Sequence, residues 1–243
     1  MPAAEPPSAE PPDFEIAWAL ADPVPGWLTR DQGRLLFDEA TAAGSGARLL
    51  EIGSHQGRST VLLGRVALAS GGEVVAIDPF VEGRLFGGTP TRERFRANLE
   101  RAGVATAVRP VEEYSGRARP GWAEEIDLLY IDGKHDVWTF SDDLRWRAFL
   151  RPGASVLVHD AFSSFGVTLG LLRTLATSSD LAYVGRTGSL ARLQQARPNV
   201  ADRLRVLGEL PWWVRNLVVK VLLRLHLRPV ARALGHRGRA DPF

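Results

Sequence analysis

A glycine-rich turn between two short apolar segments limits the fold of this chain more than any other feature. The stretch reads RLLEIGSHQGRSTVLLGRVALASGGEVVAIDPF over residues 48–80. Its first apolar run ends at Glu51, Gly53 and Gly57 bracket a turn, and an apolar helical pattern follows. A second apolar run ends at Asp78. The pattern predicts a strand, a tight turn, a helix and a second strand, with glycines that let the backbone approach a ligand.

The spacing within this unit favours a nucleoside ligand. Asp78 follows Gly57 by 21 residues, where a doubly wound sheet places an acid against ribose hydroxyls. A dinucleotide-binding loop has the pattern G-x-G-x-x-G, with a pyrophosphate at the helix N-terminus. Here the pattern is E-x-G-x-x-x-G, and the carboxylate of Glu51 disfavours a pyrophosphate and suits the ammonium of a methionine moiety. An ordinary glycine-rich strand–helix turn is the alternative without a ligand.

Strands and helices alternate along the rest of the chain. Further strands are expected at residues 107–111, 127–131 and 154–158, and helices at 29–43, 91–102, 139–150 and 166–177. Residues 181–184 and 189–193 are typical of a closing antiparallel hairpin. The order predicts an α/β fold with a doubly wound, mostly parallel seven-stranded sheet, helices on both faces and the hairpin at its C-terminal end.

Polar residues follow two of the apolar strands, at the ends where such sheets bind ligands. Asp132 and His135 follow one strand, and His159 and Asp160 follow the next. In one interpretation Asp132 and Asp160 hold a divalent cation such as Mg²⁺, which lowers the pKa of a substrate hydroxyl. In the other, His135 is the general base, and the two can coexist. His159 either takes a direct part or orients Asp160, and simple capping of buried strands is the alternative without chemistry.

Six segments between residues 26 and 193 carry a family resemblance. They are GWLTRDQGRLL (26–36), LLEIGSHQGRST (49–60), VVAIDPF (74–80), IDLLYIDGKHDV (126–137), LRPGASVLVHD (150–160) and VGRTGSLARL (184–193). In these segments the chain resembles class I methyltransferases dependent on S-adenosyl-L-methionine (SAM), of the macrocin O-methyltransferase and cephalosporin-hydroxylase-like group. The resemblance implies a Rossmann-like fold, SAM as methyl donor, and a hydroxyl of a sugar, glycolipid or secondary metabolite as acceptor.

The resemblance and the loop pattern together name the candidate site residues. The expected cofactor-binding residues are Glu51, Gly53, Ser54, Gly57, Ser59, Asp78, Glu112 and Asp132. The expected catalytic residues are His135, Asp132 and Asp160. Members of the group often bind Mg²⁺ through three acidic or amide side chains, of which Asp132 and Asp160 match two. Ala161 stands in the third place, which weakens the metal interpretation and gives His135 more weight.

Two other functions fit parts of the pattern. A nicotinamide (NAD)-dependent oxidoreductase would share the sheet, but its glycine spacing differs from the one found here. A non-catalytic protein with the same fold, attached to a membrane through its C-terminal segment, is the other alternative.

Composition sets the domain boundaries and the expected compartment. Residues 1–13 are rich in Pro, Ala and Glu and are predicted to be disordered, residues 14–196 form the methyltransferase domain, and residues 197–243 form an extension. The chain has no cysteine, which excludes disulfides, thiolate metal sites and cysteine nucleophiles. The start lacks the pattern of a signal peptide, so a cytoplasmic location is expected.

The positive charge of the chain is concentrated in the extension. From residue 197 onward ten Lys and Arg face three Asp and Glu, a net +7, whereas the whole chain carries +2. The remaining residues therefore carry −5, which argues against nucleic-acid binding by the domain. Residues 204–234 predict an amphipathic helix from Pro211 to about Leu227. Three roles fit this helix: it lies in a membrane interface, at the inner face of the membrane, it forms a homodimer, or it packs on its own domain.

Overall fold

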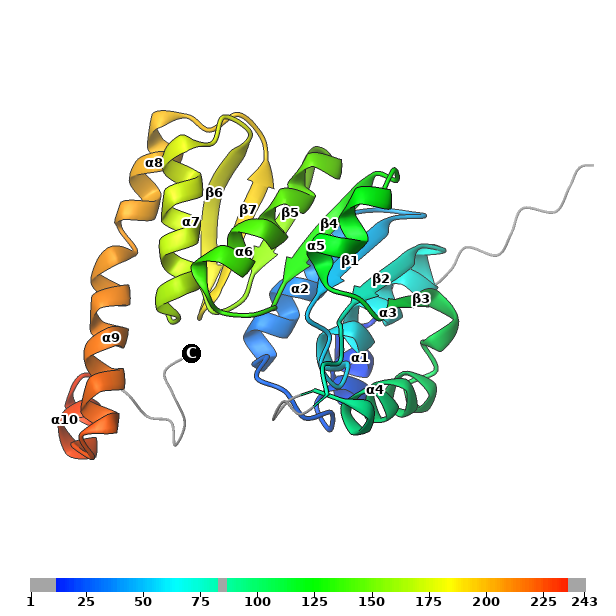
Figure 1. The fold of residues 1–243 in the computed structure, drawn as a ribbon, viewed down its shortest axis with the longest axis horizontal. Coiled ribbons are helices and arrows are strands. Elements are labelled where there is room, and N and C mark those ends of the chain that lie inside the picture. The colour runs from blue at the N-terminus through cyan, green and yellow to red at the C-terminus, as the bar shows by residue number, and fades with distance from the viewer. Residues whose placement is uncertain (1–11, 83–86, 236–243) are drawn as a thin grey trace, which may run out of the picture. The chain divides into compact units, whose positions relative to one another are not determined.

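Seven strands form one hydrogen-bonded sheet in the order β3-β2-β1-β4-β5-β7-β6 in the computed structural model, which describes residues 12–82 and 87–235 (Figure 1). The strands are β1 (Arg48–Ile52), β2 (Glu73–Ile77), β3 (Val108–Val111), β4 (Ile126–Ile131), β5 (Leu150–Val158), β6 (Leu181–Thr187) and β7 (Leu190–Gln195). Strand β2 pairs in parallel with β1 and β3, and β7 pairs antiparallel with β5 and β6. The predicted sheet and its C-terminal hairpin are confirmed.

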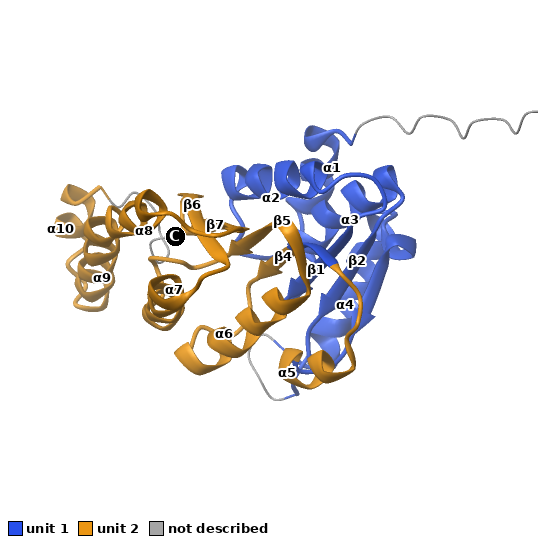
Figure 2. Ribbon diagram, turned by 90° about the horizontal axis from the view of Figure 1, so that it is seen from above, with its two compact units in different colours: residues 1–114, 126–128 blue, residues 115–125, 129–243 orange. Residues whose placement is uncertain are grey.

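Two compact units make up the chain (Figure 2). Unit 1 comprises residues 1–114 and 126–128, and unit 2 comprises residues 115–125 and 129–243. This division does not follow the predicted boundary at residue 197, which stays a prediction.

Unit 1 carries the helices α1 (Phe14–Ala21), α2 (Arg30–Ala42), α3 (Arg58–Ser70) and α4 (Thr89–Arg101). Thr29 caps α2: its hydroxyl accepts from the backbone N–H of Gln32, whose side chain accepts from the N–H of Thr29. This reciprocal capping box satisfies two donors that a helix start leaves open. In the strands, Leu50 pairs with Val75, and both are fully buried.

The start of α1 corrects one boundary of the predicted disorder. The carboxylate of Asp13 accepts from the backbone N–H groups of Glu15 and Ile16, so this residue is an ordered N-cap. The rest of that prediction, residues 1–11, lies outside the described residues.

Unit 2 carries α5 (Ser115–Ala118), α6 (Val137–Asp143), α7 (Phe165–Thr177), α8 (Val200–Leu207), α9 (Leu210–Arg224) and α10 (Arg228–Ala233). The helix predicted at residues 139–150 is wrong at its C-terminal end. After Asp143 the chain tightens into a 3-10 segment that buries Trp146 against Trp122 and Phe149. Strand β5 then starts at Leu150, because tertiary packing outweighs the helical pattern there.

The C-terminal extension contains three helices where one was predicted. Helix α9 covers most of the predicted span, and Pro229 lies in the first turn of α10. Within the described ranges, none of the helices combines the length and the apolar character that crossing a membrane requires.

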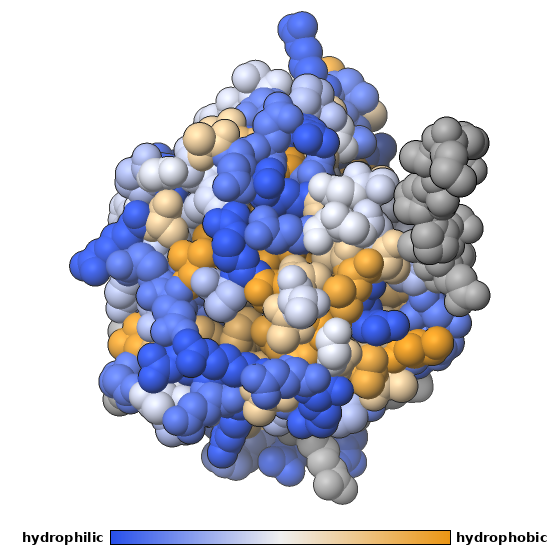
Figure 3. All heavy atoms as spheres, turned by 90° about the vertical axis from the view of Figure 1, so that its right-hand side faces the viewer, coloured by the Kyte–Doolittle hydropathy of each residue, from blue (hydrophilic) through white to orange (hydrophobic). Residues whose placement is uncertain are grey.

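One face of the molecule carries both polar and apolar areas (Figure 3). Figure 3 shows one face of the molecule, on which apolar residues gather toward the middle and hydrophilic residues surround them. Apolar atoms contribute a large share of the surface of folded proteins. A single exposed apolar residue therefore carries little functional information, whereas a continuous row of such residues points to a contact surface.

Candidate functional site

The glycine turn of unit 1 adopts the backbone that its sequence requires. Gly53 and Gly57 have φ of 89° and 91°, values that favour glycine, and His55 between them has φ of 47°. A Cβ atom on Gly57 would lie 3.1 Å from the ring of Phe95. Helix α3 begins at the next residue, with its free backbone N–H groups behind this turn.

Asp78 holds the glycine turn against the end of β2. One oxygen, Oδ2, accepts from the backbone N–H groups of Ser54 and His55 at 3.0 and 2.9 Å. The other, Oδ1, accepts from the N–H of Phe80 at 2.9 Å. Its predicted contact with ribose hydroxyls stays a prediction, and the structure adds a positioning role for the loop.

Glu51 lies beneath the same turn and is fully buried. Its two carboxylate oxygens accept from the hydroxyls of Ser59 and Thr60 in the first turn of α3. These bonds satisfy a buried carboxylate at a helix N-terminus, where negative charge is stabilised. The predicted contacts of Glu51 and Ser59 with SAM stay predictions, and both side chains have a structural task as well.

Ser54 has a buried hydroxyl within the turn. Its side chain is 2% exposed, and its Oγ has no hydrogen-bond partner among the described residues. A buried hydroxyl without a partner costs free energy, so it points to a polar atom that is absent here. Nearby, the rings of Trp27 and His55 lie 5.4 Å apart between centroids. This pair could not be recognised from the sequence, since only tertiary structure joins two loops so far apart in the chain.

Glu112 follows β3, as predicted, and forms an ion pair with each of two arginines of α4. Its oxygens lie 3.3 Å from Arg92 Nη1 and 2.5 Å from Arg96 Nη2. The predicted contact of Glu112 with the cofactor stays a prediction.

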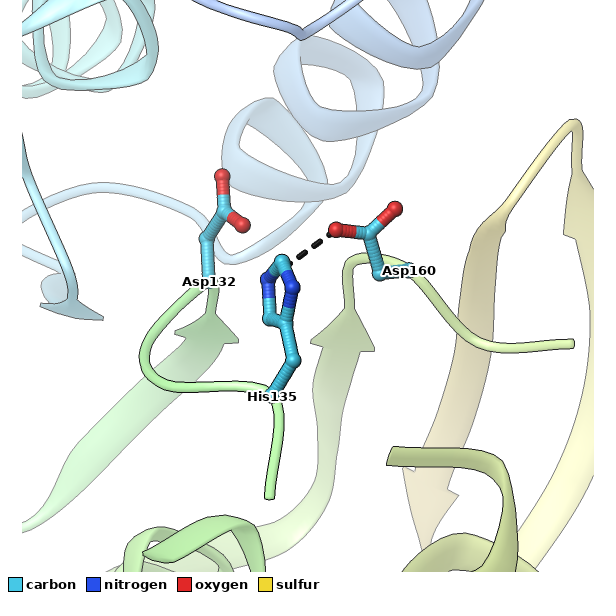
Figure 4. A group of neighbouring side chains, drawn as sticks. All are labelled: Asp132, His135 and Asp160. Carbon is cyan, nitrogen blue, oxygen red and sulfur yellow. Dashed lines mark ion pairs between the residues drawn. The ribbon is translucent and has the colours of Figure 1, made fainter. Parts of the chain in front are cut away.

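Unit 2 brings the other predicted residues together. Asp132 follows β4, His135 lies three residues further on, and Asp160 follows β5 (Figure 4). Nε2 of His135 lies 3.0 Å from Oδ2 of Asp160. Among the described residues these three form a group whose ligand atoms all lie within 4.8 Å of one another. The imidazole is partly exposed, whereas Asp160 is buried.

A second histidine lies beneath this group. His159 is buried, and its Nδ1 lies 3.3 Å from Asp132 Oδ1 and 3.5 Å from Asp160 Oδ2. The hydroxyl of Tyr130 donates to Asp132 Oδ2 at 3.1 Å. Tyr130 was missed from the sequence because it reads as one more residue of an apolar strand. The predicted orienting role of His159 fits this placement, since it lies between the two carboxylates.

The backbone at Asp160 is strained in a way that aims its carboxylate. Its φ is 57°, in the left-handed region, and Phe162 repeats this value. Aspartate tolerates this region better than most residues do, and such strain is common at functional sites. The hydroxyl of Ser163 donates to Asp160 Oδ1 at 2.9 Å, which fixes the carboxylate further.

The charges of the group shift the pKa values of its members. The hydrogen bond with Asp160 raises the pKa of His135. Burial alone lowers the pKa of His159, but the charge and hydrogen bond of Asp132, with those of Asp160, outweigh it and raise that pKa to about 10. Burial alone raises the pKa of Asp160, but its bonds to both histidines outweigh it and hold that pKa well below the usual range. The raised pKa of His159 favours its protonated form, whose charge would offset part of the negative charge of the two carboxylates.

The group fits the predicted Mg²⁺ poorly. All four oxygens of Asp132 and Asp160 already have a hydrogen-bond donor or a histidine nitrogen within 3.5 Å. Ala161, in the place of the third ligand, offers no side-chain oxygen, so water or substrate oxygens would have to complete the octahedron that Mg²⁺ prefers. Asp132 and Asp160 as metal ligands stay a prediction, and the geometry favours proton transfer.

Comparison with known proteins agrees with the fold. A family model described as a methyltransferase domain matches residues 50–161. A solved structure of cofactor-bound Rv0187 from MTB is 24% identical, with a TM-score of 0.58, over 82% of this chain and 94% of that chain. The O-methyltransferase from Bacillus cereus in complex with SAH is 20% identical, with a TM-score of 0.56, over 80% and 93%. TomG, an O-methyltransferase from Streptomyces achromogenes involved in tomaymycin synthesis, solved with SAM, is 22% identical, with a TM-score of 0.54, over 81% and 92%.

Proposed function

We propose that this protein is a SAM-dependent methyltransferase that transfers the methyl group to a hydroxyl oxygen and uses His135 as the general base, in keeping with the methyltransferase-domain model that matches residues 50–161. The hydrogen-bonded pair of His135 and Asp160 carries this proposal, because it supplies an oriented base at the carboxyl ends of two strands. The match of residues 50–161 to a methyltransferase-domain model favours this function over the NAD-dependent alternative.

The residues of unit 1 suit SAM as the cofactor. The backbone of the turn at Gly53–Gly57 leaves room for close approach. The hydroxyl of Ser54, which has no partner within the described part of the chain, can bond a polar atom of the cofactor. Asp78 keeps this turn in place. SAM supplies a methyl group that its sulfonium has already activated, so the protein has to align the acceptor and remove one proton.

His135 can remove that proton through a defined nitrogen. Because Nε2 donates to Asp160, Nδ1 is the nitrogen left to accept a proton from the acceptor hydroxyl. Asp160 stabilises the imidazolium that forms, and His159 offsets part of the negative charge beneath it. Asp132 is held by Tyr130 and His159 and acts on the electrostatics of the group. No step of this mechanism needs a metal ion.

An oxygen acceptor has support from outside the chain. Two of the structures with the same fold are O-methyltransferases by their descriptions, one of them from the synthesis of tomaymycin. Together with a base suited to a hydroxyl, this favours a hydroxylated secondary metabolite, a sugar or a glycolipid as acceptor.

The test compares the variant His135→Gln with the wild type. Calorimetry measures SAM binding, and formation of S-adenosylhomocysteine measures methyl transfer across a panel of hydroxylated acceptors. We expect SAM affinity within about twofold of wild type and a rate lower by 10²–10⁴-fold. His226→Gln changes an exposed histidine elsewhere and serves as the matched control.

Two results would contradict the proposal. Full methyl transfer by His135→Gln removes His135 as the base, and failure of the wild type to bind SAM removes the cofactor assignment. A rate that chelators abolish and Mg²⁺ restores would return Asp132 and Asp160 to the role of metal ligands.

A further inference from the structure

Helix α9 is apolar on two opposite faces, and the first of them holds it to its own unit. The ring of Trp213 packs 5.9 Å from that of Phe165, between centroids. Asn216, fully buried, donates to the carbonyl of Phe162 at 3.0 Å, and Val219 is fully buried as well. These contacts agree with the expectation that the helix packs on its own domain.

The tryptophans of α9 belong to this packed face. The guanidinium of Arg186 lies 3.8 Å from the ring centroid of Trp212, in cation–π geometry. Arg186 also pairs with Glu209 at 2.6 Å, just before the helix. The two tryptophans therefore anchor α9 within unit 2 and leave its other face to be explained.

The second face is an exposed apolar stripe. The stripe consists of Val214, Val218, Val221 and Leu225, which are between 43% and 62% exposed. Their spacing of four, three and four residues places them in one row along the helix. Leu204 and Leu207 of the preceding helix α8 are also more than half exposed. Figure 1 shows α9 and α10 extending beyond the strands of their unit.

The charge around the stripe is of one sign. Residues 210–240 contain no Asp or Glu. Within 210–235 the basic residues are Arg215, Lys220, Arg224, Arg228 and Arg232, of which the last three are exposed. A surface with exposed apolar side chains and only positive charge fits an apolar partner with a negative rim.

We propose that the stripe of α9 binds the interface of a membrane that contains anionic lipids. The valine and leucine side chains would lie among the acyl chains, and Arg224, Arg228 and Arg232 would contact the lipid headgroups. Such a helix lies in the plane of the interface, in keeping with its length. This proposal does not depend on the chemistry of the methyl transfer.

Charge decides against a second copy of this chain as the partner. A symmetric contact through the stripe would bring two acid-free, fivefold positive segments together, and like charges in contact are destabilising. Anionic headgroups provide the missing negative charge without another surface of this protein.

The experiment is flotation of the full-length protein, without SAM, with vesicles of phosphatidylcholine alone or of phosphatidylcholine mixed with phosphatidylglycerol. We expect the wild type to float with the anionic vesicles, to bind the neutral ones at least about tenfold more weakly, and to lose affinity as salt is added.

Two variants separate the apolar and the charged parts. Val214→Ser/Val218→Ser/Val221→Ser removes the apolar contact and should abolish flotation. Its control, Leu68→Ser/Leu169→Ser, changes exposed leucines on other helices and should float like the wild type. Circular dichroism checks that each variant is folded.

The charge variant leaves the apolar contact and the helix intact. Arg224→Gln/Arg228→Gln should weaken binding to anionic vesicles on the order of tenfold. Its control, Arg94→Gln/Arg101→Gln, removes two exposed arginines from unit 1 and should have no effect.

The proposal is overturned if the wild type does not float with anionic vesicles, or if the charge variant binds them as tightly as the wild type does. It is also overturned if sedimentation velocity shows a dimer that the stripe variant converts to a monomer, because a second copy would then cover the stripe.

Discussion

Asp143 carries a buried carboxyl that has only part of the partners it needs. The side chain is 1% exposed, Oδ1 accepts from the hydroxyl of Ser115, and Oδ2 has no hydrogen-bond partner among the described residues. Burial raises the pKa of Asp143 to about 6. The folded state therefore holds this proton more tightly than the unfolded chain does, since an unperturbed Asp has a pKa of about 3.9.

This carboxyl should make the protein less stable as the pH rises. The stabilisation from the bound proton is complete below about pH 4 and is lost as the pH rises through about 6. Asp143→Asn imitates the protonated form, so at pH 8 it should raise the free energy of unfolding by on the order of 1–2 kcal/mol, and at pH 4 it should change little. Urea unfolding at both pH values measures this, with the exposed Asp31→Asn as control. Equal effects at both pH values would contradict the explanation.

A second prediction at this scale concerns the pH dependence of methyl transfer. The bond to Asp160 raises the pKa of His135 above its ordinary value, and only the neutral imidazole can accept a proton. The rate should therefore rise with pH and level off above that raised pKa, falling about tenfold for each pH unit below it. Asp160→Asn removes the charge and should move the inflection to lower pH, while lowering the plateau. An inflection that stays in place would show that another group titrates.

At the scale of elements, the turn before α3 requires glycine for two separate reasons: its backbone conformation and the lack of space for a Cβ atom. Gly57 has φ of 91°, and a Cβ atom there would press on Phe95, whereas Gly44 has φ of 92° and open space around it. The two positions carry the same backbone strain, so their comparison isolates the packing term.

Gly44→Ala should cost about 1 kcal/mol of unfolding free energy, and Gly57→Ala about 2–3 kcal/mol with a loss of SAM affinity. Thermal unfolding and SAM titration measure the two effects. Equal costs at the two positions would mean that Phe95 moves aside without penalty.

Helix α9 and the loop after β5 are also joined at this scale. Asn216 donates to the carbonyl of Phe162, two residues after Asp160. Asn216→Ala leaves that buried carbonyl unsatisfied, which should cost about 1–3 kcal/mol and lower kcat on the order of tenfold as Asp160 loses its fixed place. Asn199→Ala removes the cap of α8 instead and should cost about 1 kcal/mol without lowering kcat. A wild-type kcat in Asn216→Ala would show that the loop keeps its shape unaided.

At the scale of the whole molecule, local rules explain what the sequence could predict. The turn at Gly53–Gly57, the cap at Thr29 and the order of the seven strands each depend on neighbouring residues or on alternation along the chain. The convergence of His135 and Asp160 also followed, because the ends of two predicted strands carry them.

Contacts between distant segments account for what the sequence did not reveal. The bond from Tyr130 to Asp132 lies hidden in an apolar run, and the pairing of Glu51 with Ser59 needs the folded turn to appear. The apolar pattern of residues 204–234 predicted a helix, but it could not tell that Asn216 points inward while Val218 points outward. Tertiary packing decides which face of a helix is buried, and the periodicity of apolar residues alone does not reveal it.

The hydrogen bond from Asn216 to the loop of Asp160 links helix α9 mechanically to the group of His135 and Asp160. A membrane that immobilises α9 would also fix the position of the Asp160 carboxylate. By thermodynamic reciprocity, an acceptor bound beside Asp160 would raise the affinity of α9 for the membrane. Turnover would then be greatest when the acceptor is bound and α9 is attached to a membrane. This is interfacial activation, and it needs no second regulatory site.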